Sequence, residues 1–434
     1  MTAISSRLKS FVTVAAATVL ALAPALVGCK AERPTAPPAP GQKVQLVFKH
    51  QPLWGDPAPF RALLDQFERD NPDVDVIGEY IPNASDLAHQ FYVTSLEGGA
   101  ADFDVMVIDV IWTPEFARAG WIADLSRWFP PGSLREDFLP GPVDAVVVDD
   151  RTWAVPWFVD VGLMFYRTDL VPRAPRTYAE LESFAREAMA RDPSLSGYVW
   201  QGRQYEGLNC NVFEAVWGHG GSTLEGNRLQ LDTPATREAL TWMRGLLEKG
   251  ISPPSITAAA EEETRRMFQD GRVVFMRNWP YAWAEAQQPG SPIRGRVGYA
   301  ALPTENGEPG FGTLGGWQLA VNRNIPEWRQ ALAAKFIAHM TSPRAQLQLA
   351  LHYARNPPRR SVYEMPELKE GSPFIASLLP MIERARPRPV TPWYVLVSDV
   401  LQGEFSAAIA GLRSPEVSLS RAQKLADHLM EGTQ

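Results

Sequence analysis

The sequence is poor in cysteine and histidine, and this scarcity argues against two common kinds of site. Only Cys29 and Cys210 are present, so the folded body would hold one free thiol and no internal disulfide. We expect Cys210 to be a packing residue. The six histidines are scattered and form neither an HExxH motif nor a Cys/His pattern of zinc-ligand spacing. The sequence therefore predicts no metal site and no cofactor.

The chain also lacks a strong charge of either sign. Its formal net charge is -7, and its acidic and basic residues form no long blocks. Neither nucleic acid nor an anionic membrane surface is indicated as a partner. With 434 residues, of which 45% are hydrophobic, the chain can bury a sizeable core. This length favours two domains or one large bilobal unit.

Long apolar runs are absent after the first residues of the chain. Arg7 and Lys9 precede one apolar stretch, Phe11 to Val27, which contains Pro24. A bilayer-spanning helix needs about 20 apolar residues, so a cleaved targeting segment is the better interpretation.

This stretch ends in Leu-Val-Gly-Cys at 26–29, which resembles the box cut by the lipoprotein signal peptidase. The resemblance implies a signal peptide at 1–28 and a lipid anchor on Cys29. The alternative is an ordinary signal in which Cys29 is incidental. Residues 29–42 are proline-rich and predict an extended tether, with the folded body starting near Lys43.

Strand and helix patterns alternate in the first part of the body. Strands are predicted at 44–48, 74–77 and 104–110, with helices marked by apolar spacing at 60–67 and 87–91. Such alternation predicts an open, mostly parallel sheet, in which ligands bind beyond the carboxyl ends of the strands. Asp109 lies at such an end.

The next part of the chain predicts a passage into a second lobe. Trp153 to Arg167 is apolar and extended, long enough to cross between lobes. The patterns beyond it predict helices at 178–189 and 236–247, a buried strand at 272–276 and another strand at 317–321. The strand at 272–276 brings Trp279 and Tyr281 to its end.

Two motifs are rejected from their contexts. Residues 310–315 fit GxGxxG, but a loop precedes them and a strand follows, whereas a dinucleotide site needs a strand and then a helix. The glycines are instead expected to bring backbone close to a ligand or to the other lobe. His219 to Ser222 suggests an oxyanion-hole segment, but the sequence has no GxSxG nucleophile elbow to use it.

Asp109 and Asp160 have several possible roles. They could be the acid pair of a glycoside hydrolase, or fixed acceptors for sugar hydroxyls, since a carboxylate can accept from two adjacent hydroxyls. A helix cap or a salt bridge is the ordinary alternative for each. Trp279, Tyr281 and Trp317 stand in Gly/Pro-interrupted segments, where flat rings suit the C–H face of a pyranose. Core packing is the rival interpretation for each ring.

Several long stretches resemble the extracellular solute-binding proteins of sugar ABC transporters, family 1, of the trehalose/maltose-binding type. The resemblance covers the chain from about Val44 to the C-terminus. The stretches that carry it are 104–125, 158–170, 205–221, 275–283, 314–322 and 357–368.

This resemblance implies a fold and a division of the chain. The fold would be α/β, of the type II periplasmic-binding class, with two lobes joined by a three-segment hinge. The first lobe would comprise 43–155 and 301–357, and the second 156–300 and 358–434. A di- or oligosaccharide would be captured between the lobes by hinge closure.

The resemblance also implies which residues contact the sugar. The acids would accept from hydroxyls, the aromatic rings would form walls, two glycines would bring backbone close, and an arginine would donate near the third crossing. These expected residues are Asp56, Asp109, Asp160, Trp279, Tyr281, Gly315, Gly316, Trp317 and Arg359. A second tier comprises Trp54, Phe158 and Trp393.

The implied protein is a lipid-anchored, extracytoplasmic monomer that delivers sugar to ABC permease subunits and is not an enzyme. Two alternatives stay open. One is a binder of a glycerophosphodiester or other small polyol; a glycerophosphodiester or other anion would need several basic groups in the cleft, where the sequence indicates chiefly Arg359. A lipid-anchored glycosidase would need Asp109 and Asp160 on either side of a scissile bond.

Overall fold

The computed structural model describes residues 36–39, 41–225 and 228–431, all of which belong to one compact unit. The predicted signal peptide at 1–28 and the predicted lipidation site Cys29 lie outside the described residues. None of the described helices combines the length and the apolar character that a membrane span requires.

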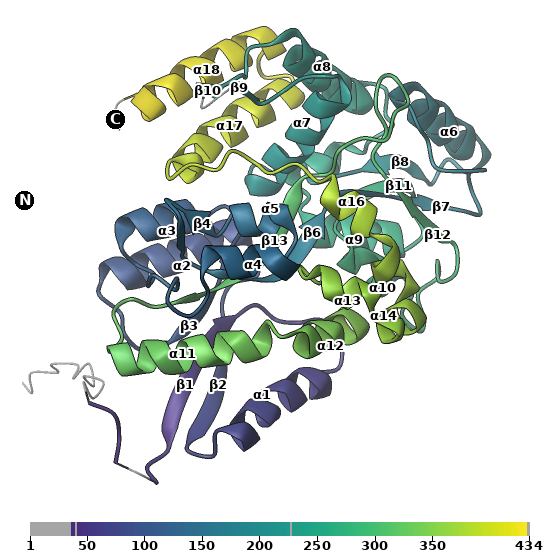
Figure 1. Ribbon diagram of the computed structural model, residues 1–434. Coiled ribbons are helices and arrows are strands. Elements are labelled where there is room, and N and C mark those ends of the chain that lie inside the picture. Colours follow the sequence, from purple (N-terminus) through teal and green to yellow (C-terminus); the bar gives the residue numbers. More distant parts are fainter. Residues whose placement is uncertain (1–35, 40, 226–227, 432–434) are drawn as a thin grey trace, which may run out of the picture. The chain divides into compact units, whose positions relative to one another are not determined.

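A five-stranded sheet forms the first half of the fold, in the order β2-β1-β3-β13-β6 (Figure 1). β1 pairs in parallel with β2 and β3, while β13 pairs antiparallel with β3 and β6. The first three strands confirm the prediction, whereas the sheet as a whole is mixed rather than mostly parallel. Its strands are β1 (Val44–His50), β2 (Val74–Tyr80), β3 (Val105–Asp109), β6 (Val155–Val161) and β13 (Leu314–Val321).

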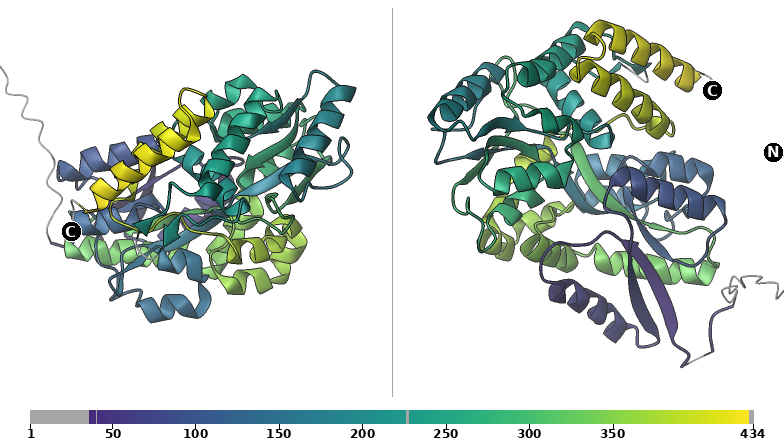
Figure 2. Two further views of the ribbon diagram at one scale, coloured as in Figure 1. Left: turned by 90° about the horizontal axis from the view of Figure 1, so that it is seen from above. Right: turned by 180° about the vertical axis from the view of Figure 1, so that it is seen from behind.

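Amphipathic helices cover this sheet and close its core. The predicted repeat at Phe60, Leu63, Leu64 and Phe67 is the buried face of α1. α11 and α12 lie beside α1 along the same face of the sheet (Figures 1 and 2). The helices here are α1 (Ala58–Asp70), α2 (Ser85–Glu97), α3 (Thr113–Ala119), α4 (Pro131–Asp137), α5 (Pro140–Asp144), α11 (Glu327–Met340) and α12 (Pro343–Tyr353), with a small ribbon of β4 (Val147–Val148) and β5 (Arg151–Thr152).

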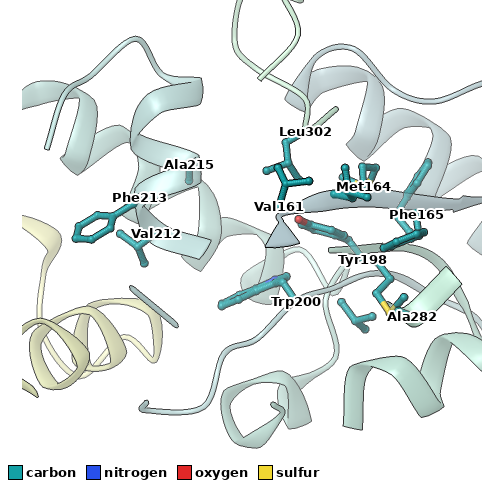
Figure 3. Packing of buried hydrophobic residues seen from close by; sticks show 14 of the residues in the cluster. Val161, Met164, Phe165, Tyr198, Trp200, Val212, Phe213, Ala215, Ala282 and Leu302 are labelled. Atoms are coloured by element: carbon teal, nitrogen blue, oxygen red, sulfur yellow. The ribbon is translucent and has the colours of Figure 1, made fainter. Parts of the chain in front are cut away.

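A four-stranded sheet, in the order β12-β7-β11-β8, forms the second half. β11 pairs in parallel with β8 and antiparallel with β7, which also pairs antiparallel with β12. Figure 3 shows part of its core, where Phe165 and Tyr198 lie close to Ala282. The strands are β7 (Leu163–Arg167), β8 (Ser196–Val199), β11 (Val273–Asn278) and β12 (Val297–Ala300), with a separate ribbon of β9 (Leu224–Glu225) and β10 (Arg228–Leu229).

The helices of the second half come from two distant parts of the chain. Thr177 and Thr233 cap α6 and α8 with their hydroxyls, which explains where the two predicted helices begin. α17 and α18 pack against α7 and α8 (Figure 2). The helices are α6 (Tyr178–Arg191), α7 (Glu206–Gly218), α8 (Pro234–Glu248), η1 (Pro254–Ala258), α9 (Glu261–Gln269), α10 (Tyr281–Ala286), α13 (Arg360–Glu364), α14 (Pro366–Gly371), α15 (Pro373–Ser377), α16 (Leu379–Glu383), α17 (Tyr394–Ile409) and α18 (Pro415–Glu431).

The chain passes between the two sheets at Gly162, again between β12 and β13, and again after α12. Gly162 admits no side chain, because a Cβ there would stand 1.9 Å from Oε1 of Glu214. Gly162 lies within the predicted crossing at 153–167. The limits predicted for the two lobes stay predictions, since they concern which segments move together.

Candidate ligand-binding site

A cavity of about 320 Å³ lies where strand ends of the first sheet face helix starts of the second half. Its first wall contains the end of β3, the start of β13 and the start of α2. Its second wall contains the starts of α7 and α9 and the segment after β11. Strand ends and helix starts both leave backbone groups and side chains free for a ligand.

Most of the predicted site residues meet in this cavity. Those that line it are Trp54, Asp109, Asp160, Trp279, Tyr281, Gly315, Gly316 and Trp317. The sheet register explains part of this meeting, because Trp317 of β13 stands opposite Asp109 and Gly315 stands opposite Asp160. The start of β13 therefore holds the two carboxylates on either side of it.

Asp56 and Arg359 are not among the lining residues, since both are engaged elsewhere. The Asp56 carboxylate accepts from the Ala58 amide at 2.9 Å, at the start of α1. The Arg359 guanidinium donates to Asp137 at 2.8 Å and to the Thr341 carbonyl at 2.7 Å. Asp56 and Arg359 therefore stabilise the fold near the ends of helices and do not face the cavity.

Phe158 and Trp393 also lie outside the lining. Phe158 is buried, and its ring is 5.1 Å from that of Trp157. Trp393 stacks beneath the Arg118 guanidinium of α3 at 3.9 Å. Trp393 precedes α17, so this stack joins the two halves of the fold rather than facing the cavity.

Asp109 is buried and held by polar partners from both walls. Its Oδ2 accepts from the Ser85 hydroxyl at 2.9 Å, and its Oδ1 accepts from Arg388 at 3.3 Å. Arg388 also donates to Glu206 at 3.0 Å. Buried ions need partners of this kind, because an isolated charge pays a large desolvation penalty. Asp109 is thus held in place as a hydrogen-bond acceptor at the cavity surface.

Asp160 is equally buried but less well supplied with partners. It accepts one long hydrogen bond, of 3.4 Å, from the Asn356 amide. Burial raises the pKa of Asp160 to about 6, against the lowering influence of the nearby Arg355 guanidinium. Its carboxylate has capacity left for a donor supplied by a ligand.

Gly315 and Gly316 are required by close approach at the same place. A Cβ on Gly315 would meet the Trp279 ring at 3.1 Å. Gly316 has a φ of +128°, and a Cβ there would stand 2.5 Å from the Phe158 carbonyl oxygen. A side chain at Gly315 would disturb the contact between β13 and the second wall, and one at Gly316 would clash with the backbone of β6.

The aromatic side chains of the second wall are oriented by hydrogen bonds and stacking. The Trp279 ring lies 4.0 Å from the Arg277 guanidinium, and its Nε1 donates to Glu261 at 3.3 Å. The Tyr281 hydroxyl donates to Glu262 at 2.9 Å. Glu263 in turn accepts from the Ala260 amide at 3.0 Å and so fixes the start of α9. Rings fixed in this way lose little entropy when a ligand binds.

The sequence patterns did not indicate several of the residues that line the cavity. They are chiefly charged and lie at helix starts or on connecting segments: Arg203, Glu206, Glu261, Glu262, Glu263, Arg355 and Arg388. The triple glutamate before a helical pattern was a visible signal, because acidic residues favour a helix N-terminus. No comparable pattern marks the arginines.

Cys210 also lines the cavity, although it is buried as expected of a packing residue. Burial raises the pKa of its thiol, which keeps it protonated. Within the part of the chain that the structure describes, no group of three His, Cys, Asp or Glu side chains could hold a metal ion.

Known proteins resemble this chain over most of its length. A profile of the family described as bacterial extracellular solute-binding protein matches residues 52–347. A probable ABC transporter-binding protein of Deinococcus radiodurans is 35% identical over 343 residues, which are 76% of this chain and 79% of the relative.

Solved structures agree with this match. The maltose-bound MalE3 of T. maritima has 37% identity and a TM-score of 0.83, covering 89% of this chain and 99% of that one. A solute-binding protein of Agrobacterium vitis with bound D-mannitol has 23% identity and a TM-score of 0.72, covering 90% and 99%. These likenesses confirm the predicted type II periplasmic-binding fold.

Proposed function

The chain belongs to the bacterial extracellular solute-binding proteins, and we propose that it captures a sugar or polyol in the cavity and delivers it to an ABC permease. The observation that carries this proposal is the shared cavity of Asp109, Asp160, Trp279 and Trp317. Carboxylates accept from ligand hydroxyls, while ring faces pack against the C–H face of a sugar. A volume of about 320 Å³ suits a small ligand.

Hinge closure is the proposed mode of capture. The two walls belong to different sheets, and the connecting segments run between them beside the cavity. A ligand that contacts both walls binds the closed arrangement more tightly than an open one, and so shifts the population toward closure. The closed form is what the permease would recognise.

Within this class, we favour a disaccharide of the maltose or trehalose type. The support is the 37% identity to the maltose-bound MalE3, together with the aromatic residues on both walls. A polyol is the second candidate, since the A. vitis protein of the same fold carries D-mannitol.

An anionic ligand is less well supported, although the cavity has more arginine than the sequence indicated. Arg203, Arg355 and Arg388 all line it. Arg388, however, is already paired with Asp109 and Glu206. The lining carboxylates outnumber the arginines, so a glycerophosphodiester would meet repulsion.

We propose a binding role rather than glycoside hydrolysis. Both oxygens of Asp109 accept from protein donors, Ser85 and Arg388, which suits a fixed hydrogen-bond acceptor rather than a nucleophile or a base. A retaining or inverting hydrolase would need a carboxylate that is free to attack the sugar or to activate water. Release of reducing sugar from maltose by the purified protein would contradict this assignment.

The N-terminal segment is proposed to export and anchor the protein. Signal cleavage before Cys29, lipidation of its thiol and the proline-rich tether would hold a monomeric body at the outer side of the membrane. Mass spectrometry of the N-terminal peptide from membrane fractions would test this, and an unmodified Cys29 would contradict it.

The ligand class can be tested by thermal shift on the body from Lys43 onward, which contains both sheets and both cores. Maltose, trehalose, sucrose, mannitol and glycerophosphodiesters would be compared. A ligand present at 100 times its Kd stabilises the folded state by about 2.7 kcal/mol. We expect a rise in melting temperature with at least one sugar or polyol. A shift with glycerophosphodiesters alone would contradict the proposal.

A further inference from the structure

Arg355 follows a turn in which a non-glycine residue adopts an unfavourable left-handed backbone conformation. α12 ends at Tyr353, and Ala354 then takes a left-handed conformation, with φ of 51°. Residues with a side chain seldom adopt this conformation, and strain of this kind gathers at functional sites. The next residue, Arg355, lines the cavity. The strained turn is thus what brings this guanidinium to the ligand space.

The Arg355 side chain makes no hydrogen bond and no ion pair within the described part of the chain. Its Nε is buried without a hydrogen bond, and no ion pair reaches its other nitrogens. It rests 4.7 Å from the Phe158 ring, and burial lowers its pKa. Arg359, four residues later, donates to Asp137 and to the Thr341 carbonyl.

Asp160 stands next to Arg355 through a fixed backbone contact. The Val159 amide donates to the Asn356 carbonyl at 3.0 Å, and the Asn356 side chain donates to the Val159 carbonyl at 2.9 Å. The bridge between these two residues is antiparallel, so their neighbours, Asp160 and Arg355, adjoin. The two side chains interact electrostatically, yet they form no ion pair.

We propose that Arg355 is a specificity-determining residue that, together with Asp160, holds one hydroxyl group of the ligand. This inference rests on the proposed sugar-binding function. A carboxylate only accepts and a guanidinium only donates, whereas a hydroxyl does both. One hydroxyl can therefore donate to Asp160 and accept from Arg355. An ammonium would lack the acceptor, a carboxylate would lack the donor, and a deoxy sugar would leave both protein groups unpaired.

The test compares Arg355→Met with Arg359→Met, using calorimetric titration of maltose and its monodeoxy derivatives and, without ligand, thermal melting. A hydrogen bond to a charged group corresponds to a loss of about 10- to 100-fold in affinity when removed. We expect this loss for maltose in Arg355→Met, with an unchanged or higher melting temperature. Arg359→Met should keep the affinity and melt at a lower temperature, because it loses an ion pair.

The deoxy sugars identify the hydroxyl. One monodeoxy maltose should bind the wild-type protein about 10- to 100-fold more weakly than maltose and should lose nothing further in Arg355→Met. Unchanged maltose affinity in Arg355→Met, or a fall in its melting temperature as large as that of Arg359→Met, would overturn the proposed role of Arg355. Neither result would overturn the proposed function. If the wild-type protein bound no sugar or polyol, the proposed function would fail with it.

Discussion

Asp109 and Arg388 form an ion pair of 3.3 Å in the cavity wall, and both side chains are buried. Asp109 ends β3 of the first sheet, whereas Arg388 lies on the segment before α17 in the second half. The proposed ligand contact Asp109 is therefore also a link between the two halves. Its removal should affect binding and stability together.

The first prediction concerns Asp109→Ala. This change leaves Arg388 with Glu206 as its remaining acidic partner, so the free energy of unfolding should fall by about 1–3 kcal/mol. Affinity for the ligand should fall at least about 10-fold, because a charged acceptor is lost. Urea unfolding and calorimetric titration measure the two effects. Asp144→Ala, at an exposed position outside the cavity, is the control. Native affinity in Asp109→Ala would contradict the site.

The second prediction concerns Gly316→Ala. A Cβ at this left-handed position would stand 2.5 Å from the Phe158 carbonyl, so the free energy of unfolding should fall by about 1–3 kcal/mol. Gly132→Ala is a matched control, since nothing lies within 4 Å of a Cβ there and the residue is in helix α4. The control should be neutral or slightly stabilising. Equal unfolding midpoints for both variants would show that the Gly316 backbone is not constrained.

The third prediction concerns pH. The pKa of Asp160 is raised to about 6 in the folded protein, above its unfolded value, so the folded state binds this proton more tightly. Its contribution to stability is therefore present at low pH and is lost as pH rises through about 6. A ligand hydroxyl that donates to Asp160 prefers the ionised form, so affinity should increase over the same range.

Calorimetric titration at about pH 5 and about pH 8 measures this effect, with Asp160→Asn as the control. The charged groups that also act on this carboxyl are Arg355, Asp109 and Arg277. The wild-type affinity should rise with pH, and that of the variant should change less. A steeper dependence in Asp160→Asn would assign the titration to another group.

The fourth prediction concerns the buried pair of Arg277 and Glu214. Glu214 accepts from Arg277 and from the Thr313 amide at 2.8 Å, next to the passage at Gly162. Glu214→Ala removes the acidic partner of a buried guanidinium and should cost about 3–5 kcal/mol of unfolding free energy. Asp232→Ala, which breaks a surface pair with Arg237, should cost under about 1 kcal/mol. Similar losses in both would mean that Glu214 is not a buried partner.

Local patterns were sufficient to predict the elements that carry the site. The spacing at 60–67 indicated α1, and the apolar run at 104–110 indicated β3 with Asp109 at its end. The approach of Asp109 and Asp160 to either side of β13 depends on antiparallel register. Periodicity does not fix which strands pair, so the resemblance to a family supplied that part.

The sequence does not indicate which arginines reach the cavity. Arg355 and Arg359 are four residues apart, and only the left-handed turn at Ala354 brings the first of them to the cavity. Alanine is not a residue that signals such a turn, so nothing in the local pattern favours Arg355 over Arg359. Arg388 likewise depends on partners, Asp109 and Glu206, that are distant in sequence.

The central claim is that a carbohydrate binds against Trp279 in the cavity. Its most direct test is calorimetric titration of the wild-type protein and Trp279→Ala with maltose, trehalose, sucrose and mannitol. Trp128→Ala is the control, since Trp128 is not among the lining residues. We expect saturable one-to-one binding of at least one of these to the wild-type protein and the control, and a loss of about 10-fold or more in Trp279→Ala. Equal affinity in all three proteins, or no binding of any carbohydrate, would contradict the account.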